Sequence, residues 1–372
     1  MAVSGRDYYD ELSALPLTID GYDVERLELD VSSGFTRRTT TVVLRGGGRE
    51  GRGEDVTYLN EDHEVYPLDL SLGGPRTLDE FSSQIGAHDL FPARPPGMAA
   101  ARDYRRWAFE SAALDLALRQ AGRSLGAALG LEYRPVRFVV STRLDISPWL
   151  GVDPRLEFKL DPTPEWDAET MARIAAGGRV RALDFKAFYE GTPVDNAPDP
   201  VQYAAVARAF PDAILEDPVL EGPARRALDG QEARFSFDAP IHSWADVEAV
   251  AKAAGLQASP GPGGANGTDA GSLRRTRLPS HLNIKPSRFG SLHALFDCVA
   301  RATAEGITLY GGGQFELGVG RDHIQALASL LYPDGPNDVA PRDFHGEPRA
   351  GVPRSPLLPS AQGPGFGFAF AR

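Results

Sequence analysis

The pattern that most constrains this chain is a series of apolar runs, each ending in a charged residue and followed by a segment with helical spacing. In AILEDP, residues 213–218, three apolar residues run into Glu216, a second acid and a proline, as at the end of a buried strand. Similar runs end near Asp184, Asp238 and Lys285. Strands that alternate with helices form a parallel sheet, and ligands bind at the carboxyl ends of its strands. Three carboxylates and a lysine at successive strand ends predict a site for a hard metal ion with a base beside it.

Length and composition are those of a globular protein with more than one unit. The chain has 372 residues, enough for a barrel plus a second domain. Its net charge of −12 argues against nucleic acid or an anionic membrane as a partner. The single cysteine, Cys298, excludes an internal disulfide and favours a reducing compartment. The N-terminus has no apolar core of the signal-peptide type, and no run reaches the roughly 18 apolar residues of a membrane span. We therefore expect a cytoplasmic protein.

The chain divides into an N-terminal α+β unit and a longer βα part. Residues 17–60 contain alternating and β-branched stretches typical of antiparallel strands, and their glycine-rich GGGREGRGED is interpreted as a hairpin turn. An Ala- and Leu-rich helix is predicted over 103–130. From about 136 to 332 the strand and helix patterns give seven or eight βα units, the number that a (β/α) barrel needs. The low-complexity segment 259–280 is expected to be a mobile surface insertion.

The order of these residues resembles the enolase superfamily, in particular its muconate-lactonizing and mandelate-racemase-like branch, over nearly the whole chain. The strands and GRGED resemble that family's capping domain, and GPGFGFAF resembles the closing strand that returns to the cap. The resemblance implies the α/β class: a modified (β/α)8 [(β/α)7β] TIM barrel with an α+β capping domain. It places the cap in residues 1–130, the barrel in 131–345 and the C-terminal segment that returns to the cap in 346–372.

The same resemblance assigns the strand-end residues to roles. Asp184, Glu216 and Asp238 stand at the ends of strands three, four and five, where the family holds Mg²⁺. Lys285 stands at the position of the family's lysine on strand six, and is expected to act as general base or acid. Glu316 in GGGQFELGVG stands at the strand-seven position and is expected to contact the substrate.

The chain departs from the family pattern on strand two. The lactonizing branch has a Lys-x-Lys pair there, whereas this chain has Lys159 and Asp161. Lys186 stands where an asparagine is common, and the period of two in a strand directs it to the same face as Asp184. Lys159 and Lys186 are therefore further candidates for catalytic lysines. Asp161 is a candidate substrate contact, with the capping of a loop as the alternative.

Two more residues are candidate substrate contacts. His242 follows the third acid closely enough to reach the pocket, although a loop histidine bonded only to protein is the alternative. Arg37 lies in the polar segment SSGFTRR, which corresponds to a cap loop that closes over the substrate in similar enzymes. Its guanidinium is expected to bind a substrate carboxylate.

These residue types suit one kind of chemistry. Removal of a proton next to a carboxylate gives an enediolate dianion, whose charge a magnesium ion can stabilise. Sites of the enolase type combine magnesium with a lysine or histidine base. The base must be neutral, and burial and nearby cations are expected to lower its pKa. We predict a Mg²⁺-dependent enzyme that abstracts an α-proton from a small carboxylate, in the first place a lyase that dehydrates an acid sugar or a related hydroxy acid.

Other functions are open at this stage. A racemase or epimerase needs bases on both faces of the substrate, which strands two or three and six could provide. A cycloisomerase is less favoured without the second lysine on strand two. A degenerate barrel that only binds metal or a ligand, or an aldolase-type barrel with a phosphate site, would use the same architecture. A homo-oligomer is expected because members of the superfamily commonly form oligomers.

Overall fold

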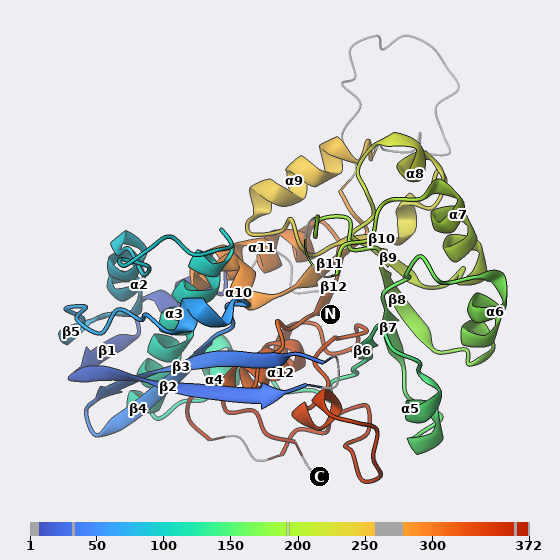
Figure 1. The fold of residues 1–372 in the computed structure, drawn as a ribbon. Helices are drawn as coiled ribbons and strands as arrows, with labels where there is room; N and C mark the ends of the chain where they lie inside the picture. The colour runs from blue at the N-terminus through green and yellow to red at the C-terminus, as the bar shows by residue number, and fades with distance from the viewer. Residues whose placement is uncertain are drawn as a thin grey trace.

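The computed structural model describes residues 7–31, 34–190, 192, 194–256, 278–360 and 363–370. The predicted insertion 259–280 therefore lies, except for residues 278–280, outside the described residues. The N-terminal part forms a cap of strands and helices, and a curved parallel sheet with outer helices follows it (Figure 1).

The cap is built on an antiparallel sheet of three strands, as the sequence predicts for this region. Its strands pair in the order β2 (Gly21–Asp30), β3 (Thr36–Gly46) and β4 (Arg49–Asp55). A two-stranded pair of β1 (Pro16–Ile19) and β5 (Gly74–Thr77) completes the cap strands. The cap helices are α1 (Asp10–Ser13), α2 (Leu78–Ala87), α3 (Ala101–Gln120) and α4 (Leu125–Leu129).

The glycines of GGGREGRGED have two different roles in this sheet. Gly47 and Gly48 have positive φ angles and make the turn between β3 and β4 that the sequence predicts. Gly51 and Gly53 lie within β4 itself, where a Cβ would overlap backbone atoms of α3. These two glycines were interpreted as part of the turn, and that part of the prediction was wrong. They allow the long cap helix to pack directly on the strand.

The barrel sheet has seven parallel strands that follow one another in chain order. They are β6 (Val140–Thr142), β7 (Phe158–Leu160), β8 (Val180–Asp184), β9 (Ile214–Glu216), β10 (Phe235–Phe237), β11 (His281–Ile284) and β12 (Thr308–Gly311). Residues 337–338 stand between the two edges, because Asn337 pairs with Phe138 and Asp338 pairs with Gly312, both in parallel. This short segment takes the eighth position, so the predicted (β/α)7β barrel with a capping domain is confirmed.

Helices cover the outside of the barrel strands (Figure 1). They are α5 (Ser147–Val152), α6 (Ala168–Ala176), α7 (Pro200–Ala209), α8 (Gly222–Arg226), α9 (Trp244–Ala253), α11 (Leu292–Ala304) and α12 (Val319–Leu331). The single turn α10 (Pro286–Phe289) instead follows the carboxyl end of β11 and packs against α3 of the cap. Asp167 caps α6 by accepting a hydrogen bond of 2.8 Å from the backbone N–H of Thr170. Within the described residues, none of the helices has the length and apolar character needed to cross a membrane.

Two buried charged side chains of the cap are bonded to the barrel loop that follows β12. Arg37, expected in a cap loop, lies in β3 and is fully buried. Its guanidinium donates to backbone carbonyls on both sides of the interface, among them Val56 at 2.6 Å and Gln314 at 3.0 Å. Glu54 of β4 accepts N–H bonds from Leu317, Gly318 and Gly320 at the start of α12. These bonds fix the cap sheet to the barrel.

The C-terminal segment contacts both the cap and the entry to the barrel. The carbonyl of Gly365 accepts a 2.8 Å hydrogen bond from the N–H of Leu125, and the N–H of Phe366 donates to Asp115 of α3 at 3.2 Å. Leu357 pairs with Val136 at the entry to the barrel. The segment therefore connects cap and barrel on the side of α3 and α4.

Arg37→Ala is expected to lower the free energy of unfolding by about 3–5 kcal/mol, because several buried carbonyls lose their donor. Denaturant unfolding measures the change. The neighbouring Arg38, which forms ion pairs with the half-exposed Glu28 and Glu64, is the matched control and should change stability little on substitution by alanine. Equal, small effects for both variants would contradict this account of the interface.

Candidate metal centre and its lysines

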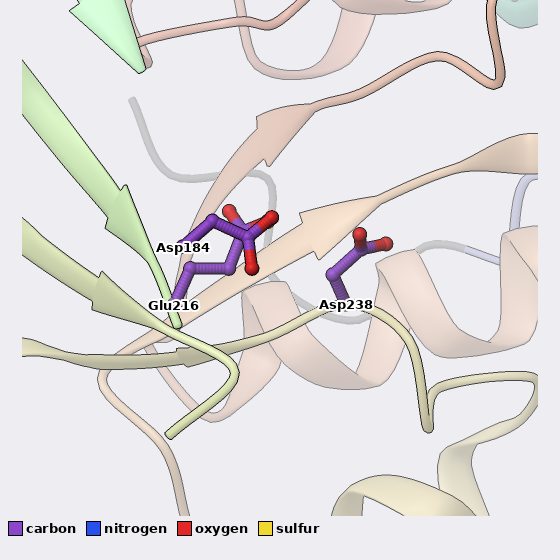
Figure 2. A group of neighbouring side chains, drawn as sticks. All are labelled: Asp184, Glu216 and Asp238. Carbon is purple, nitrogen blue, oxygen red and sulfur yellow. The ribbon is translucent and has the colours of Figure 1, made fainter. Parts of the chain in front are cut away.

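Three carboxylates meet at the carboxyl ends of successive barrel strands (Figure 2). Asp184 is the last residue of β8 and Glu216 the last of β9, and these two residues are paired in the parallel register. Asp238 directly follows β10. All three side chains are fully buried, and one oxygen of each lies within 4.8 Å of the others. The three residues that the sequence selects as metal ligands are therefore brought together.

The chemistry of this donor set fits a hard divalent cation. Magnesium takes oxygen ligands at about 2.0–2.1 Å, so that two of its ligands lie about 3 Å apart when adjacent and about 4 Å apart when opposite. One oxygen of each carboxylate lies within 4.8 Å of the others, so the three could ligate one ion after small shifts of the side chains. The pKa of Glu216 is raised to about 7: burial raises it most, Asp184 and Asp238 raise it as well, and Lys159 lowers it by less than these together. A bound cation would relieve this repulsion between the carboxylates.

Two lysines contact the triad on the side of Asp184. Lys159 of β7 is buried, and its Nζ lies 3.2 Å from Asp184 Oδ2 and contacts Glu216. Lys186 follows β8 with a φ of 57°, and its Nζ contacts Asp184 and lies 3.7 Å from Asp161. Asp161 therefore lies next to Lys186, one of the candidate catalytic lysines.

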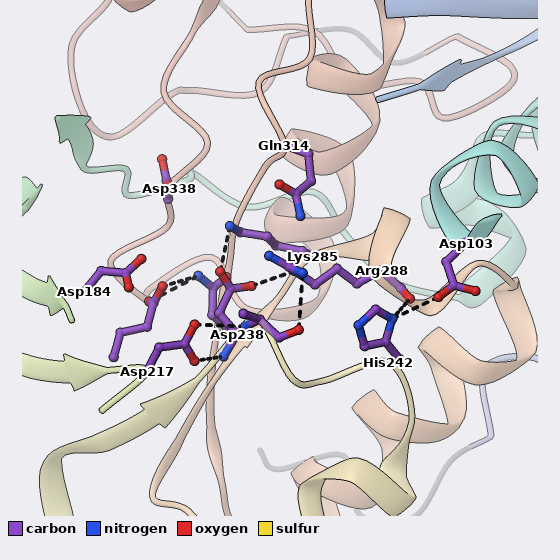
Figure 3. A network of polar contacts seen from close by, with 12 residues as sticks. Asp103, Asp184, Asp217, Asp238, His242, Lys285, Arg288, Gln314 and Asp338 are labelled. Carbon is purple, nitrogen blue, oxygen red and sulfur yellow. Dashed lines mark hydrogen bonds and ion pairs between the residues drawn. The ribbon is translucent and has the colours of Figure 1, made fainter. Parts of the chain in front are cut away.

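Lys285 contacts the triad on the other side, at Asp238 (Figure 3). It directly follows β11, and its Nζ lies 2.7 Å from Asp238 Oδ2. Arg288 binds the second oxygen, with its Nε 3.1 Å from Asp238 Oδ1. Burial raises the pKa of Asp238, but Arg288 and Lys285 lower it by more, to about 2. The acid triad thus has lysines on two sides.

For each lysine, the effect of nearby carboxylates on its pKa outweighs the effect of nearby cations. Burial lowers the pKa of Lys159, but Glu216 and Asp184 raise it by more, so that it lies well above the ordinary value. For Lys285, burial likewise lowers the pKa and Asp238 raises it by more. The sequence argument expected lowered pKa values, and for the protein groups alone the direction is the opposite. The reason is that each ammonium is paired with a carboxylate that the cation would share.

The remaining predicted substrate contacts are placed among other protein groups. Glu316 pairs with Arg321 at 3.0 Å and accepts the N–H of Gln314 at 2.6 Å. The guanidinium of Arg37 is bonded to the backbone carbonyls described above. His242 contacts Asp103 of the cap and the backbone carbonyl of Arg288 (Figure 3). The structure therefore brings Asp161, but none of these three, into contact with the lysines.

Several residues of the site were not selected from the sequence. The carboxylate of Asp217 accepts N–H bonds from Asp238 at 2.8 Å and Ala239 at 3.0 Å, which fixes the end of β10. Tyr310 of β12 contacts Glu216, and Asn283 of β11 donates to Glu216 at 3.2 Å. Asp338 in the eighth position lies 3.9 Å from Lys159 Nζ. Asn283 stands two residues before Lys285, so the strand period could have indicated that both face the same side.

Comparisons with known proteins identify the family of this chain. Its N-terminal part matches the model "Domain of unknown function (DUF8230) N-terminal domain" over residues 10–128. The rest matches the model of the DUF8230 C-terminal domain over residues 132–262 and 268–346. The chain belongs to the DUF8230 family.

This DUF8230 protein is also similar to one named enzyme in sequence and to several solved structures in fold. It is 26% identical over 380 residues to N-succinylamino acid racemase of Thermus thermophilus. The aligned region covers 92% of this chain and 90% of the relative. Among solved structures, an enolase superfamily member from Listeria innocua matches with a TM-score of 0.63, 16% identity and 95% coverage of each chain. Muconate lactonizing enzyme from Pseudomonas putida matches with a TM-score of 0.57, 18% identity and coverage of 95% and 97%. The resemblance of the DUF8230 protein to the enolase superfamily is confirmed.

Asp238→Asn is expected to weaken Mg²⁺ binding by more than about 100-fold, because a buried carboxylate ligand becomes a neutral amide. Calorimetric titration of the purified protein with MgCl₂ measures the change. Asp338→Asn is the matched control, since Asp338 lies at the edge of the group and outside the triad, and it should retain binding. Loss of binding in the control but not in Asp238→Asn would contradict the assignment of the ligands.

Proposed function

We propose that this protein is a Mg²⁺-dependent enzyme that removes the α-proton of a carboxylate substrate. The observation that carries the proposal is the arrangement of lysines around the buried triad: Lys285 contacts Asp238, while Lys159 and Lys186 contact Asp184. When bound, Mg²⁺ supplies positive charge that stabilises the negative charge developing on the substrate carboxylate. The fold shared with enolase superfamily members supports the proposal, and so does the all-oxygen donor set.

The protein's own residues hold and move the proton. A lysine accepts a proton only in its neutral form, so one lysine must be neutral at Nζ while the lysine opposite remains protonated as the donor. Lys285 serves one face of the substrate, and Lys159 or Lys186 serves the other. Their ion pairs with Asp184 and Asp238 hold each Nζ beside the triad, which reduces the freedom that the side chain would lose when it transfers a proton.

Racemisation or epimerisation is the reaction that this arrangement supports best. Removal of the α-proton by one lysine breaks a C–H bond, and delivery of a proton by the lysine opposite forms a new C–H bond on the other face. No oxidant and no leaving group is needed. The similarity to an enzyme named N-succinylamino acid racemase supports the same reaction and makes N-acylated amino acids the first substrate class to test.

Elimination of water, the reaction favoured by the sequence, is the second candidate. The ammonium groups of Lys159 and Lys186 share Asp184, and the pKa of Lys186 is lowered by burial and raised by more by Asp161 and Asp184. A protonated lysine of this kind could give its proton to a departing hydroxyl of a hydroxy acid. Cycloisomerisation and a non-catalytic binding role remain further alternatives. The cytoplasmic location and the homo-oligomeric state stay predictions.

Lys285→Ala and Lys159→Ala are expected to affect opposite enantiomers of the same substrate. In D₂O with MgCl₂, α-proton exchange is followed by NMR for both enantiomers of a panel of N-succinylamino acids and hydroxy acids. Each variant should lose exchange of one enantiomer by about 10²–10⁴-fold and retain more of the other, because each lysine serves one face. Lys252→Ala on the exposed surface of α9 is the control and should resemble the wild type.

The same measurement separates the candidates. Equal loss for both enantiomers in Lys285→Ala would show that a single base acts, and release of an unsaturated acid would identify elimination. Mg²⁺-free protein should show no exchange. Wild-type protein that binds Mg²⁺ but exchanges no α-proton of any panel member would favour the non-catalytic role.

Lys186→Asn is expected to lower α-proton exchange by about 100-fold or more, since it removes one ammonium of the Asp184 side. The second variant, Asp161→Lys combined with Lys186→Asn, should regain part of the activity. It returns an ammonium to the same face of β7, two residues from Lys159. Full activity of Lys186→Asn alone, measured by the same NMR assay, would remove Lys186 from the catalytic set.

A further inference from the structure

A cap residue and a barrel histidine meet beside the candidate site. Asp103 lies in the first turn of α3, and His242 lies in the loop between β10 and α9. The Nδ1 atom of His242 is 2.9 Å from Asp103 Oδ2 and 2.9 Å from the backbone carbonyl of Arg288 (Figure 3). Both partners are hydrogen-bond acceptors, so Nδ1 carries a proton in either charge state of the ring.

Arg288, one of the residues that His242 contacts, belongs to the 285–290 turn, which consists of the single-turn helix α10 and its two flanking residues and follows β11. Within this turn the N–H of Arg288 donates to the carbonyl of Lys285 at 2.9 Å, and Gly290 has a φ of 67°. A Cβ at Gly290 would lie 2.9 Å from Asp103 Oδ1 and 3.2 Å from its Cα. The 285–290 turn therefore packs directly against the first turn of α3, and only glycine fits there without a shift.

The same turn carries the groups that hold the third carboxylate. Lys285 and Arg288 each bind one oxygen of Asp238, and Arg288 also donates to Tyr189 at 2.9 Å and lies 3.4 Å from the hydroxyl of Tyr104 on α3. A shift of the turn by even 1 Å would move the Lys285 ammonium relative to the triad. Such a displacement can cost an enzyme about 100-fold in rate.

We propose that Asp103 and His242 form a positioning pair that fixes the 285–290 turn, and with it Lys285 and Arg288, against the cap. His242 was a candidate substrate contact from the sequence, and its hydrogen bonds support this different role. The effect on turnover rests on the proposed function, whereas the effect on the turn itself does not. Because α3 is part of the cap, the pair makes the geometry of the barrel site depend on cap docking.

The charge of His242 is set by groups from three elements. The hydrogen bond to Asp103 of α3 raises the pKa of His242, while burial and Arg288 on the 285–290 turn lower it, and the net direction is upward. The backbone N–H of His242 donates to the carboxylate of Asp246 of α9 at 3.0 Å. A raised pKa in the fold means that the stabilisation is fully present below the ordinary pKa of about 6.5 and is lost as pH rises through the folded value.

Amide hydrogen exchange tests the pair without any substrate. Exchange of residues 285–290 is followed by mass spectrometry in the intact protein, and residues 213–217 on β9 serve as the internal reference. His242→Ala should raise exchange of the turn at least about tenfold over the reference, and Asp103→Asn should raise it less. His242→Gln, whose amide N–H₂ can donate to both acceptors, should restore part of the protection. His88→Ala, a partly exposed cap histidine, is the control.

The wild type gives a second and independent readout. Exchange rates are corrected for the intrinsic pH dependence of amide exchange, and the pKa of His242 is measured by NMR of the labelled imidazole. The turn should lose protection as pH rises through this pKa. Asp103→Asn should move both midpoints to lower pH together. Unchanged exchange of the turn in His242→Ala and in Asp103→Asn, with no pH step in the wild type, overturns the proposal.

Turnover distinguishes this proposal from the proposed function. With a panel member whose α-proton the wild type exchanges, His242→Ala should lower kcat by up to about 100-fold with a smaller change in KM, since no substrate contact is lost. A loss confined to KM would instead make His242 a substrate contact and overturn the positioning role. If the wild type exchanges no substrate proton at all, the proposed function fails, while the hydrogen-exchange result still decides whether the pair holds the turn.

Discussion

The burial of three carboxylates side by side is the constraint on which the rest of the site depends. Charged groups removed from water need partners, and carboxylates that face one another raise each other's pKa. Here Lys159 contacts Glu216, Lys186 contacts Asp184, and Lys285 contacts Asp238. Each lysine comes from a different strand end, so the parallel register of the barrel brings acids and ammonium groups into one layer. Burying these charged groups costs desolvation free energy, and the same groups are the ones that the proposed chemistry requires.

The cap contributes geometry more than it contributes reacting groups. Arg37 and Glu54 attach the cap sheet to the loop after β12, and the first turn of α3 packs against the turn that carries Lys285. Each of these contacts uses a polar side chain that is bonded to backbone groups or to another side chain. A cap held at two such places can keep the strand ends of the barrel in a fixed arrangement.

The sequence predicts the fold and the triad because both follow from local patterns. Asp184 and its two partners end apolar runs, and the ends of parallel strands meet at one edge whatever the intervening helices contain. Lys186 reaches the expected partner, although its positive φ places it beyond the regular strand. Asp338 could not be found in this way, since its strand is a short bridge within a proline- and glycine-rich tail. Arg37 was assigned to a substrate because sequence gives its charge but not the backbone carbonyls that surround it.

A crystal structure of the protein grown with MnCl₂ tests the central claim most directly, because Mn²⁺ replaces Mg²⁺ at oxygen sites and gives an anomalous signal. The account predicts one strong anomalous peak among Asp184, Glu216 and Asp238, with Lys285 and Lys159 on opposite sides of it. A site that contains no peak at saturating Mn²⁺, with the Lys159 ammonium between Asp184 and Glu216 instead, would contradict the metal-dependent account.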